Sequence, residues 1–170
     1  MELPKERRML PIVIDIEASG FGRESYPIEV GLVLPDGTPH CFLVAPERSW
    51  THWDPSAEAV HGISRDILEA HGRPAAEVAW RLNELLRGKT AYTDAWSFDM
   101  SWLGKLYDAV HLQQSFDLQP LSGIMDERRL AGWDRTRRQV EQDLQLKRHR
   151  ASGDARILQE TYRRLTEQAA

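Results

Sequence analysis

The feature that most constrains the fold is a short alternating segment that carries two acids. Residues 11–17 read PIVIDIE, with isoleucine at every even position. Successive side chains of a β-strand point to opposite faces, so the isoleucines share one face while Asp15 and Glu17 share the other. The segment is otherwise apolar, which predicts a strand in the core of a sheet. Because a buried carboxylate is costly without a partner, the fold has to supply one to these two acids.

The next two segments predict antiparallel pairing with this strand. IEVGLVL (28–34) has the composition of a second strand, and HCFLVA (40–45) has that of a third. Between them, Asp36-Gly37 is a strong signal for a tight hairpin turn. The chain is therefore expected to open with three antiparallel strands.

The remainder of the chain alternates between helical and extended patterns. An apolar stripe runs through 75–87 and Gly88 follows it, which predicts a helix that ends there. The other predicted elements are short helices at 55–60 and 64–69, strands at 89–93 and 115–118, and helices at 97–110, 126–131, 135–147 and 153–168. This order predicts an α/β domain with three layers around a mixed sheet.

Size and composition narrow the class of protein. The 170 residues suffice for one domain with a substantial core. The formal net charge of −4 argues against a protein that holds nucleic acid by overall charge alone, although bound cations would change the sign locally. The lone cysteine, Cys41, excludes an internal disulfide, and no apolar run reaches the length of a membrane span. We therefore expect a cytoplasmic setting and no membrane.

Two further acids lie on the apolar stripe of a predicted helix. The positions +3, +4 and +7 from Asp99 are Trp102, Leu103 and Leu106, which is the spacing of one helix face. The residues at +3, +4 and +11 from Asp154 are also apolar, and this acid falls in the first turn of its helix. Both carboxylates are therefore expected to face inward.

Each acid has an ordinary explanation when it is taken alone. Asp154 and Asp99 would each serve as a first-turn helix acid, and Asp15 would bond to backbone. Together with Glu17 they would repel one another and raise one another's pKa. Divalent cations remove that repulsion, and oxygen ligands suit Mg²⁺ or Mn²⁺. Two such ions about 3.5–4 Å apart are the arrangement that cleaves phosphodiesters.

Among the histidines, His149 has the context that most suggests chemistry. It precedes Asp154 by five residues, just ahead of the helix that carries that acid. A neutral imidazole beside a metal-bound water is a suitable general base, because histidine exchanges protons near neutral pH. The residues alone therefore predict metal-dependent phosphodiester cleavage.

The set of motifs resembles the DEDDh family of 3′→5′ exonucleases, which includes proofreading subunits of replicative polymerases, ribonuclease T and oligoribonuclease. The family's Asp-x-Glu motif matches Asp15 and Glu17. Its second acid, which opens a helix after the fourth strand, matches Asp99, and its His-x4-Asp motif matches His149 and Asp154. VHGIS (60–64) also resembles a segment that follows the third strand in many members. The resemblance runs in order over about residues 11–165.

The resemblance implies a fold and a domain plan. It implies a ribonuclease-H-like α/β domain of three layers, with a five-stranded mixed sheet and helices on both faces. A single exonuclease domain is expected over 1–170, with flexible ends at 1–9 and 167–170.

The resemblance also implies a role for each site residue. Two Mg²⁺ ions, for which Mn²⁺ would substitute, are expected on Asp15, Glu17, Asp99 and Asp154. His149 is expected to deprotonate the attacking water. The expected substrate is a 3′ end of single-stranded DNA or RNA, and the products are nucleoside 5′-monophosphates. The choice between DNA and RNA stays open, because recognition of the 2′-hydroxyl depends on the shape of the groove.

Four further residues are predicted to contact the substrate. Ala18 stands where family members often have threonine, and its backbone is expected to approach the terminal sugar. Phe21 would stack on the terminal base, with a place in the core as the equal alternative. His61 would shape the groove, although a purely structural turn is the stronger interpretation. Trp96 precedes the second motif and is the tryptophan expected nearest the site.

The basic segment 121–150 adjoins His149 and would guide a phosphate backbone, although charged helix faces are usually just solvated. A ribonuclease-H-like endonuclease shares clustered carboxylates, but the His-x4-Asp motif argues against it. A non-catalytic nucleic-acid-binding or polymerase-associated module of the same fold is the alternative from another class. The protein partners that we consider are a second copy of the chain, in a homodimer, or a polymerase.

Overall fold

The computed structural model describes residues 9–168. Most of the ends expected to be flexible, 1–9 and 167–170, therefore lies outside the described residues. The elements in chain order are β1 (Ile12–Ala18), β2 (Pro27–Val33), β3 (Pro39–Leu43), α1 (Pro55–His61), α2 (Arg65–His71), α3 (Ala75–Leu86), β4 (Thr90–Thr93), α4 (Trp96–Ala109), β5 (Asp117–Pro120), the 3-10 helix η1 (Leu121–Ile124), α5 (Glu127–Leu144) and α6 (Ala151–Gln168). Within the described range, no helix combines the length and the apolar character that a membrane span needs.

The five strands form one mixed sheet in the order β3-β2-β1-β4-β5. β1 pairs antiparallel with β2, and β2 pairs antiparallel with β3. The expected turn joins the last two, with Gly37 in the left-handed region at a φ of 88°. β4 lies parallel to β1, and β5 lies parallel to β4. The central position of β1 confirms that its alternating sequence belongs to a core strand.

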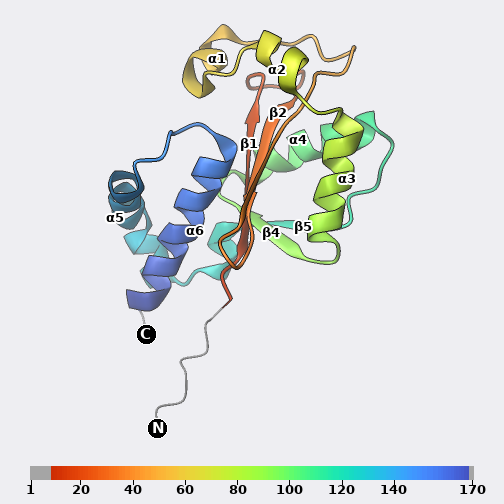
Figure 1. The fold of residues 1–170 in the computed structure, drawn as a ribbon. Helices are drawn as coiled ribbons and strands as arrows, with labels where there is room; N and C mark the ends of the chain where they lie inside the picture. The colour runs from red at the N-terminus through yellow and green to blue at the C-terminus, as the bar shows by residue number, and fades with distance from the viewer. Residues whose placement is uncertain (1–8, 169–170) are drawn as a thin grey trace.

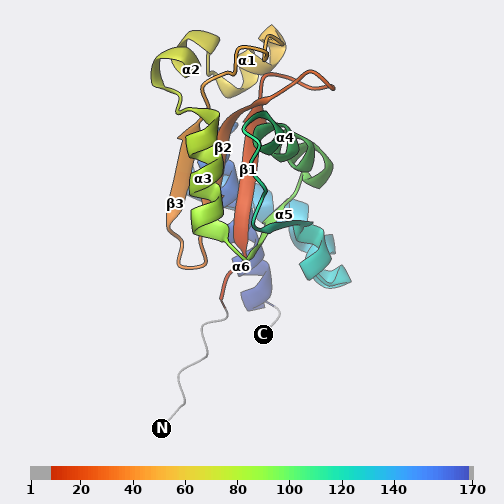
Figure 2. The same ribbon diagram turned by 90° about the vertical axis from the view of Figure 1, so that its right-hand side faces the viewer.

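Helices cover both faces of the sheet, as Figures 1 and 2 show. α3 and α4 lie on one face, and α6 lies on the other with α5 outside it. The isoleucines of β1 belong to the same apolar core as Leu82 of α3 and Leu103 of α4. Val13, on the opposite face of β1, packs with Leu158 of α6 in a second core. The predicted α/β domain of three layers is therefore confirmed, and the face of Val13, Asp15 and Glu17 is the face that α6 covers.

The structure differs from the sequence-based expectation chiefly in α5, while the ends of several other elements shift by one or two residues. α5 is one helix over Glu127–Leu144, whereas we expected two helices at 126–131 and 135–147. The apparent break contains Gly132, and a Cβ built there would lie 3.0 Å from Leu165 on α6. The glycine therefore permits close packing of the two helices, which keeps α5 continuous. β5 begins two residues later than expected and α6 begins two residues earlier.

Candidate active site

The ends of one strand and two helices bring the predicted acids to the same region of the molecule. Asp15 and Glu17 lie on β1, whose neighbour β4 runs parallel to it. The chain leaves β4 and enters α4 at once, so that Asp99 lies in the first turn of that helix. α6 packs on the same face of β1 as these acids and carries Asp154 in its own first turn. Ligand sites in α/β proteins commonly form where parallel strands end in this way.

Asp99 is the most deeply buried of the four acids, with 1% of its surface exposed. The hydroxyl of Thr93 donates a hydrogen bond to Oδ2 of Asp99, and Oδ1 is buried without a partner among the described residues. Burial raises the pKa of Asp99 to about 8, and the charges of Asp94 and Glu17 add to that effect, against the Thr93 hydrogen bond. Asp99 is therefore a carboxylate that the fold buries without fully compensating its charge.

The other acids act on one another through space. Burial raises the pKa of Asp15 well above its ordinary value, and the charges of Asp99, Glu17 and Asp154 raise it further. Burial and the charge of Asp154 raise the pKa of Glu17 to about 7. The pKa of Asp15 thus responds to each of the other three carboxylates, which is the mutual repulsion expected of acids that converge.

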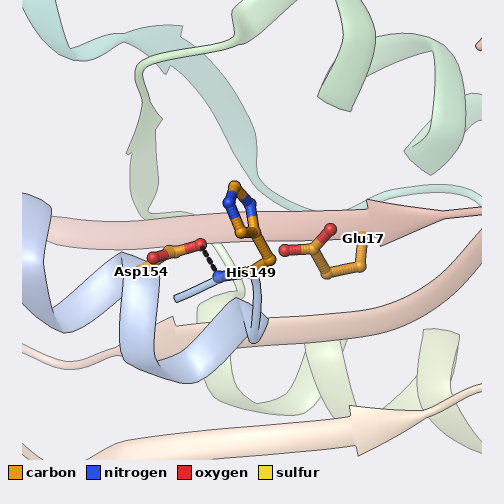
Figure 3. A group of neighbouring side chains, drawn as sticks. All are labelled: Glu17, His149 and Asp154. Atoms are coloured by element: carbon orange, nitrogen blue, oxygen red, sulfur yellow. Dashed lines mark hydrogen bonds between the residues drawn. The ribbon is translucent and has the colours of Figure 1, made fainter. Parts of the chain in front are cut away.

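His149 lies with two of these acids in a compact group (Figure 3). One ligand atom each from Glu17, His149 and Asp154 lies within 4.8 Å of the other two. The backbone N–H of His149 donates to Oδ2 of Asp154 at 2.9 Å. Burial raises the pKa of Asp154, although Arg148 and the His149 N–H act in the opposite direction. The His-x4-Asp spacing therefore closes a loop that holds the imidazole beside the acids.

The arrangement fits divalent cations. Four buried side-chain atoms of the described residues lack a hydrogen-bond partner, and two of them are Oδ1 of Asp99 and Oδ1 of Asp154. Oδ1 of Asp154 has Nε of Arg148 3.5 Å away as an ion pair, whereas Oδ1 of Asp99 has neither kind of partner among the described residues. Buried oxygens are normally hydrogen-bonded, so both atoms could accept an external partner. Carboxylate oxygens are the ligands that Mg²⁺ and Mn²⁺ prefer. Among the described residues, the group whose ligand atoms lie within 4.8 Å of one another is Glu17, His149 and Asp154, and it includes neither Asp15 nor Asp99. Cations bound by these carboxylates would satisfy the unpartnered oxygens and offset the repulsion at Asp15 and Glu17.

The predicted substrate residues differ in their access to solvent. Phe21 is 68% exposed, so the alternative of a place in the core is wrong. Its ring meets that of Phe98 edge to face at a centroid distance of 5.3 Å, and the ring of Trp102 lies 6.3 Å away. Trp96 is 41% exposed, and its indole N–H donates to the carbonyl of Leu118 at 2.8 Å. An exposed aromatic group therefore lies next to Asp99 on α4.

The remaining two candidates are buried. Ala18 ends β1, where the register with β2 shifts after Glu17. His61 is 2% exposed, and its Nδ1 accepts the backbone N–H of Ile63 at 3.1 Å. Gly62 follows in the left-handed region with a φ of 70° and ends α1. In the structure His61 closes a turn, and its contact with substrate stays a prediction.

Sequence reasoning missed the groups that surround the acids. Nothing in the sequence distinguished Thr93, because a threonine at the end of a strand is common and gives no sign that its hydroxyl bonds to Asp99. Arg137 bonds to Asp94 at 2.8 Å and to Glu141 at 3.2 Å, and Arg148 bonds to Glu141 at 2.7 Å. Part of the basic segment 121–150 is therefore engaged in ion pairs.

One missed residue did leave a signal in the sequence. Glu29 interrupts an otherwise apolar strand in the same way as Asp15, and it is fully buried. It therefore qualified as a fifth inward carboxylate.

The five-stranded mixed sheet with helices on both faces is a ribonuclease-H-like α/β fold. Solved structures of exonuclease I share it. The apo form of exonuclease I matches with a TM-score of 0.70 and 15% identity, over 92% of this chain and 41% of that chain. E. coli exonuclease I in complex with a dA16 oligonucleotide matches with a TM-score of 0.64 and 14% identity, over 95% of this chain and 43% of that one.

The zinc-bound form of the E. coli exonuclease I complex with single-stranded DNA matches with a TM-score of 0.64 and 17% identity, over 92% of this chain and 42% of that one. This chain thus spans less than half of the length of these three proteins. No protein-family model matches the chain, and a search of the curated proteins found no match. At such low identity the likeness establishes the fold.

Proposed function

We propose that this chain is a metal-dependent 3′→5′ exonuclease of the DEDDh type that acts on single-stranded nucleic acid. The observation that carries the proposal is the incompletely compensated acidic cluster around β1. Its acids have raised pKa values, and His149 lies within 4.8 Å of ligand atoms of Glu17 and Asp154. Perturbed groups of this kind gather at catalytic sites more often than elsewhere.

The acids of the cluster would hold two Mg²⁺ ions, with Mn²⁺ as a substitute. The ligands in this proposal are Asp15, Glu17, Asp99 and Asp154. Bound there, the ions would polarise the scissile phosphate and stabilise the leaving oxygen. Asp15 is the acid proposed to contact both ions, because its pKa responds to all three other carboxylates.

His149 is the proposed general base, which takes a proton from the attacking water. Its backbone N–H bonds to Oδ2 of Asp154, which ties the residue that carries the imidazole to this acid. An imidazole in this role contributes about 10²–10⁴-fold to the rate.

The proposed substrate is a single-stranded 3′ end, released stepwise as nucleoside 5′-monophosphates. The fold shared with exonuclease I bound to a dA16 oligonucleotide supports this substrate class. The exposed ring of Phe21, backed by Phe98, offers a flat apolar surface on which an unpaired base can stack. Ala18 at the end of β1 and Trp96 at the start of α4 are proposed to contact the terminal nucleotide.

The test incubates the protein and Mg²⁺ with end-labelled single-stranded DNA, RNA and dinucleotides in parallel. Loss of a 3′ label as mononucleotide, with a 5′-labelled strand that shortens in steps, is the expected result. Asp15→Asn should be inactive, whereas Asp66→Asn, which changes an exposed acid on α2, should retain activity. Cleavage of a circular single strand would instead establish an endonuclease. Binding of Mn²⁺ without hydrolysis of any 3′ end would establish a non-catalytic module.

A further inference from the structure

A fifth carboxylate lies beside the site but differs from the four acids in its partners. Glu29 of β2 pairs directly with Glu17 of β1 in the antiparallel register. Residues that face each other in this way project from the same face of the sheet, about 4.5–5.5 Å apart at their Cβ atoms. Glu29 is fully buried on this face, under the start of α6.

The charge of Glu29 is compensated within the chain. Arg150 donates to the carboxylate in a fork, from Nη2 to Oε1 at 2.6 Å and from Nε to Oε2 at 3.1 Å. The backbone N–H of Ala151 donates to Oε2 at 2.8 Å, and the thiol of Cys41 lies 3.3 Å from Oε1. A forked arginine–carboxylate pair fixes direction as well as distance, so Glu29 holds two consecutive residues at the entrance to α6.

A second feature of β2 supports the same segment. Gly31 lies two residues beyond Glu29 and therefore on the same face of the strand. A Cβ at Gly31 would overlap the backbone of Ala151 and Ser152, so β2 and the start of α6 are in direct contact there. The strand thus positions this segment by a charge at Glu29 and by close contact at Gly31.

His149 comes directly before the residues that β2 contacts at the start of α6. Its φ of 58° is in the left-handed region, which is unfavourable for a residue with a Cβ. Such a conformation persists where the surroundings over-determine it. On one side its N–H bonds to Asp154, and on the other Arg150 and Ala151 bond to Glu29.

We propose that the Glu29–Arg150 ion pair is a positioning pair, which holds His149 and Asp154 against Glu17 in the geometry that catalysis requires. This inference rests on the proposed function. Stability alone does not explain the pair, because replacing a buried ion pair with well-packed apolar residues often leaves a protein equally stable. The charge of Glu29 raises the pKa of Glu17, and the charge of Arg150 acts against that effect.

The first experiment needs neither metal nor activity. Amide hydrogen exchange, measured by NMR, compares the wild type with Glu29→Gln and with Arg150→Lys, which keeps the charge but not the fork. Protection of the His149 and Ala151 amides should fall about tenfold or more in Glu29→Gln, and less in Arg150→Lys. Glu160→Gln is the matched control. Glu160 lies on α6 six residues beyond Asp154, and it forms ion pairs with Arg163 and Arg164. Unchanged protection of His149 in Glu29→Gln would overturn the inference.

The second experiment asks whether Glu29 acts through His149. Glu29→Gln should lower kcat about 10- to 100-fold with little change in KM, at a temperature where the variant is fully folded. In a His149→Ala background the same change should cost several-fold less than in the wild type, because one of the two groups that it positions is already gone. Losses that multiply in the double variant would overturn the positioning role. A wild-type protein without any nuclease activity would defeat the proposed function, while amide exchange would still decide whether Glu29 holds the His149 segment.

Discussion

Glu17 and Glu29 face each other on neighbouring strands, yet the fold treats them in opposite ways. Glu29 is fully buried and accepts hydrogen bonds from Arg150 and from the backbone of Ala151. Glu17 is half-buried, and burial and the charge of Asp154 raise its pKa to about 7. Burial of an acid therefore does not by itself indicate a functional site. The informative feature is a buried acid whose charge the chain leaves uncompensated, as at Glu17 and Asp99.

This difference assigns two tasks to the same chemical group. The compensated acid connects β2 to the start of α6 and needs nothing from outside the chain. The uncompensated acids retain protons near neutral pH until a cation replaces them, so metal binding should release protons.

The largest effect is expected at Asp15. Asp15→Asn removes the carboxylate whose pKa responds to all three others and should lower mononucleotide release by about 10⁴-fold or more. The measurement is release of a 3′ label under single-turnover conditions, with circular dichroism to establish that the variant is folded. Activity within tenfold of the wild type would show that the acidic cluster is not the catalytic centre.

His149→Ala should have the next largest effect on catalysis. Loss of the general base is expected to reduce kcat by about 10²–10⁴-fold while Mn²⁺ affinity stays within a few-fold. Isothermal titration calorimetry with Mn²⁺ separates the two quantities. A collapse of Mn²⁺ affinity would instead make His149 a ligand rather than a base.

Opposite signs of stability change are expected for two buried acids in the metal-free protein. Glu29→Gln leaves Arg150, which is 36% exposed, without its charged partner and weakens the hydrogen bonds at the start of α6, so it should lower the free energy of unfolding by about 1–3 kcal/mol. Asp99→Asn removes an uncompensated charge and should raise the free energy of unfolding at pH 8 by at least about 1.4 kcal/mol, the equivalent of one pKa unit. Urea unfolding in EDTA measures both. Changes of the same sign would contradict the division between the two kinds of acid.

A pH dependence is also expected in the metal-free protein. The folded-state pKa values of Glu17, about 7, and Asp99, about 8, lie above their ordinary values of 4.5 and 3.8. Protonation therefore favours the folded state, and this stability is lost as the pH rises from about 4 through 8. Tm in EDTA should fall across this window, and saturating Mg²⁺ or Mn²⁺ should reduce the fall. A Tm that rises with pH over the same window would contradict the raised pKa values.

Much of the fold and of the candidate site was predictable from local patterns. Alternation in PIVIDIE indicated the core strand and put Asp15 and Glu17 on one face, as observed. Helical spacing placed Asp99 on a buried stripe, and it is 1% exposed. The break expected within α5 was wrong, because a glycine that weakens an isolated helix here permits contact with α6.

The sequence by itself determined which residues are strand, which are helix and which acids face inward, because these properties follow from the periods of the backbone. Only the tertiary structure decided which inward acid has a partner. Glu29 and Glu17 look alike in their segments, and Arg150 is more than 100 positions from both. Compensation of a buried charge depends on groups a few ångströms away in space, and sequence distance carries no information about them.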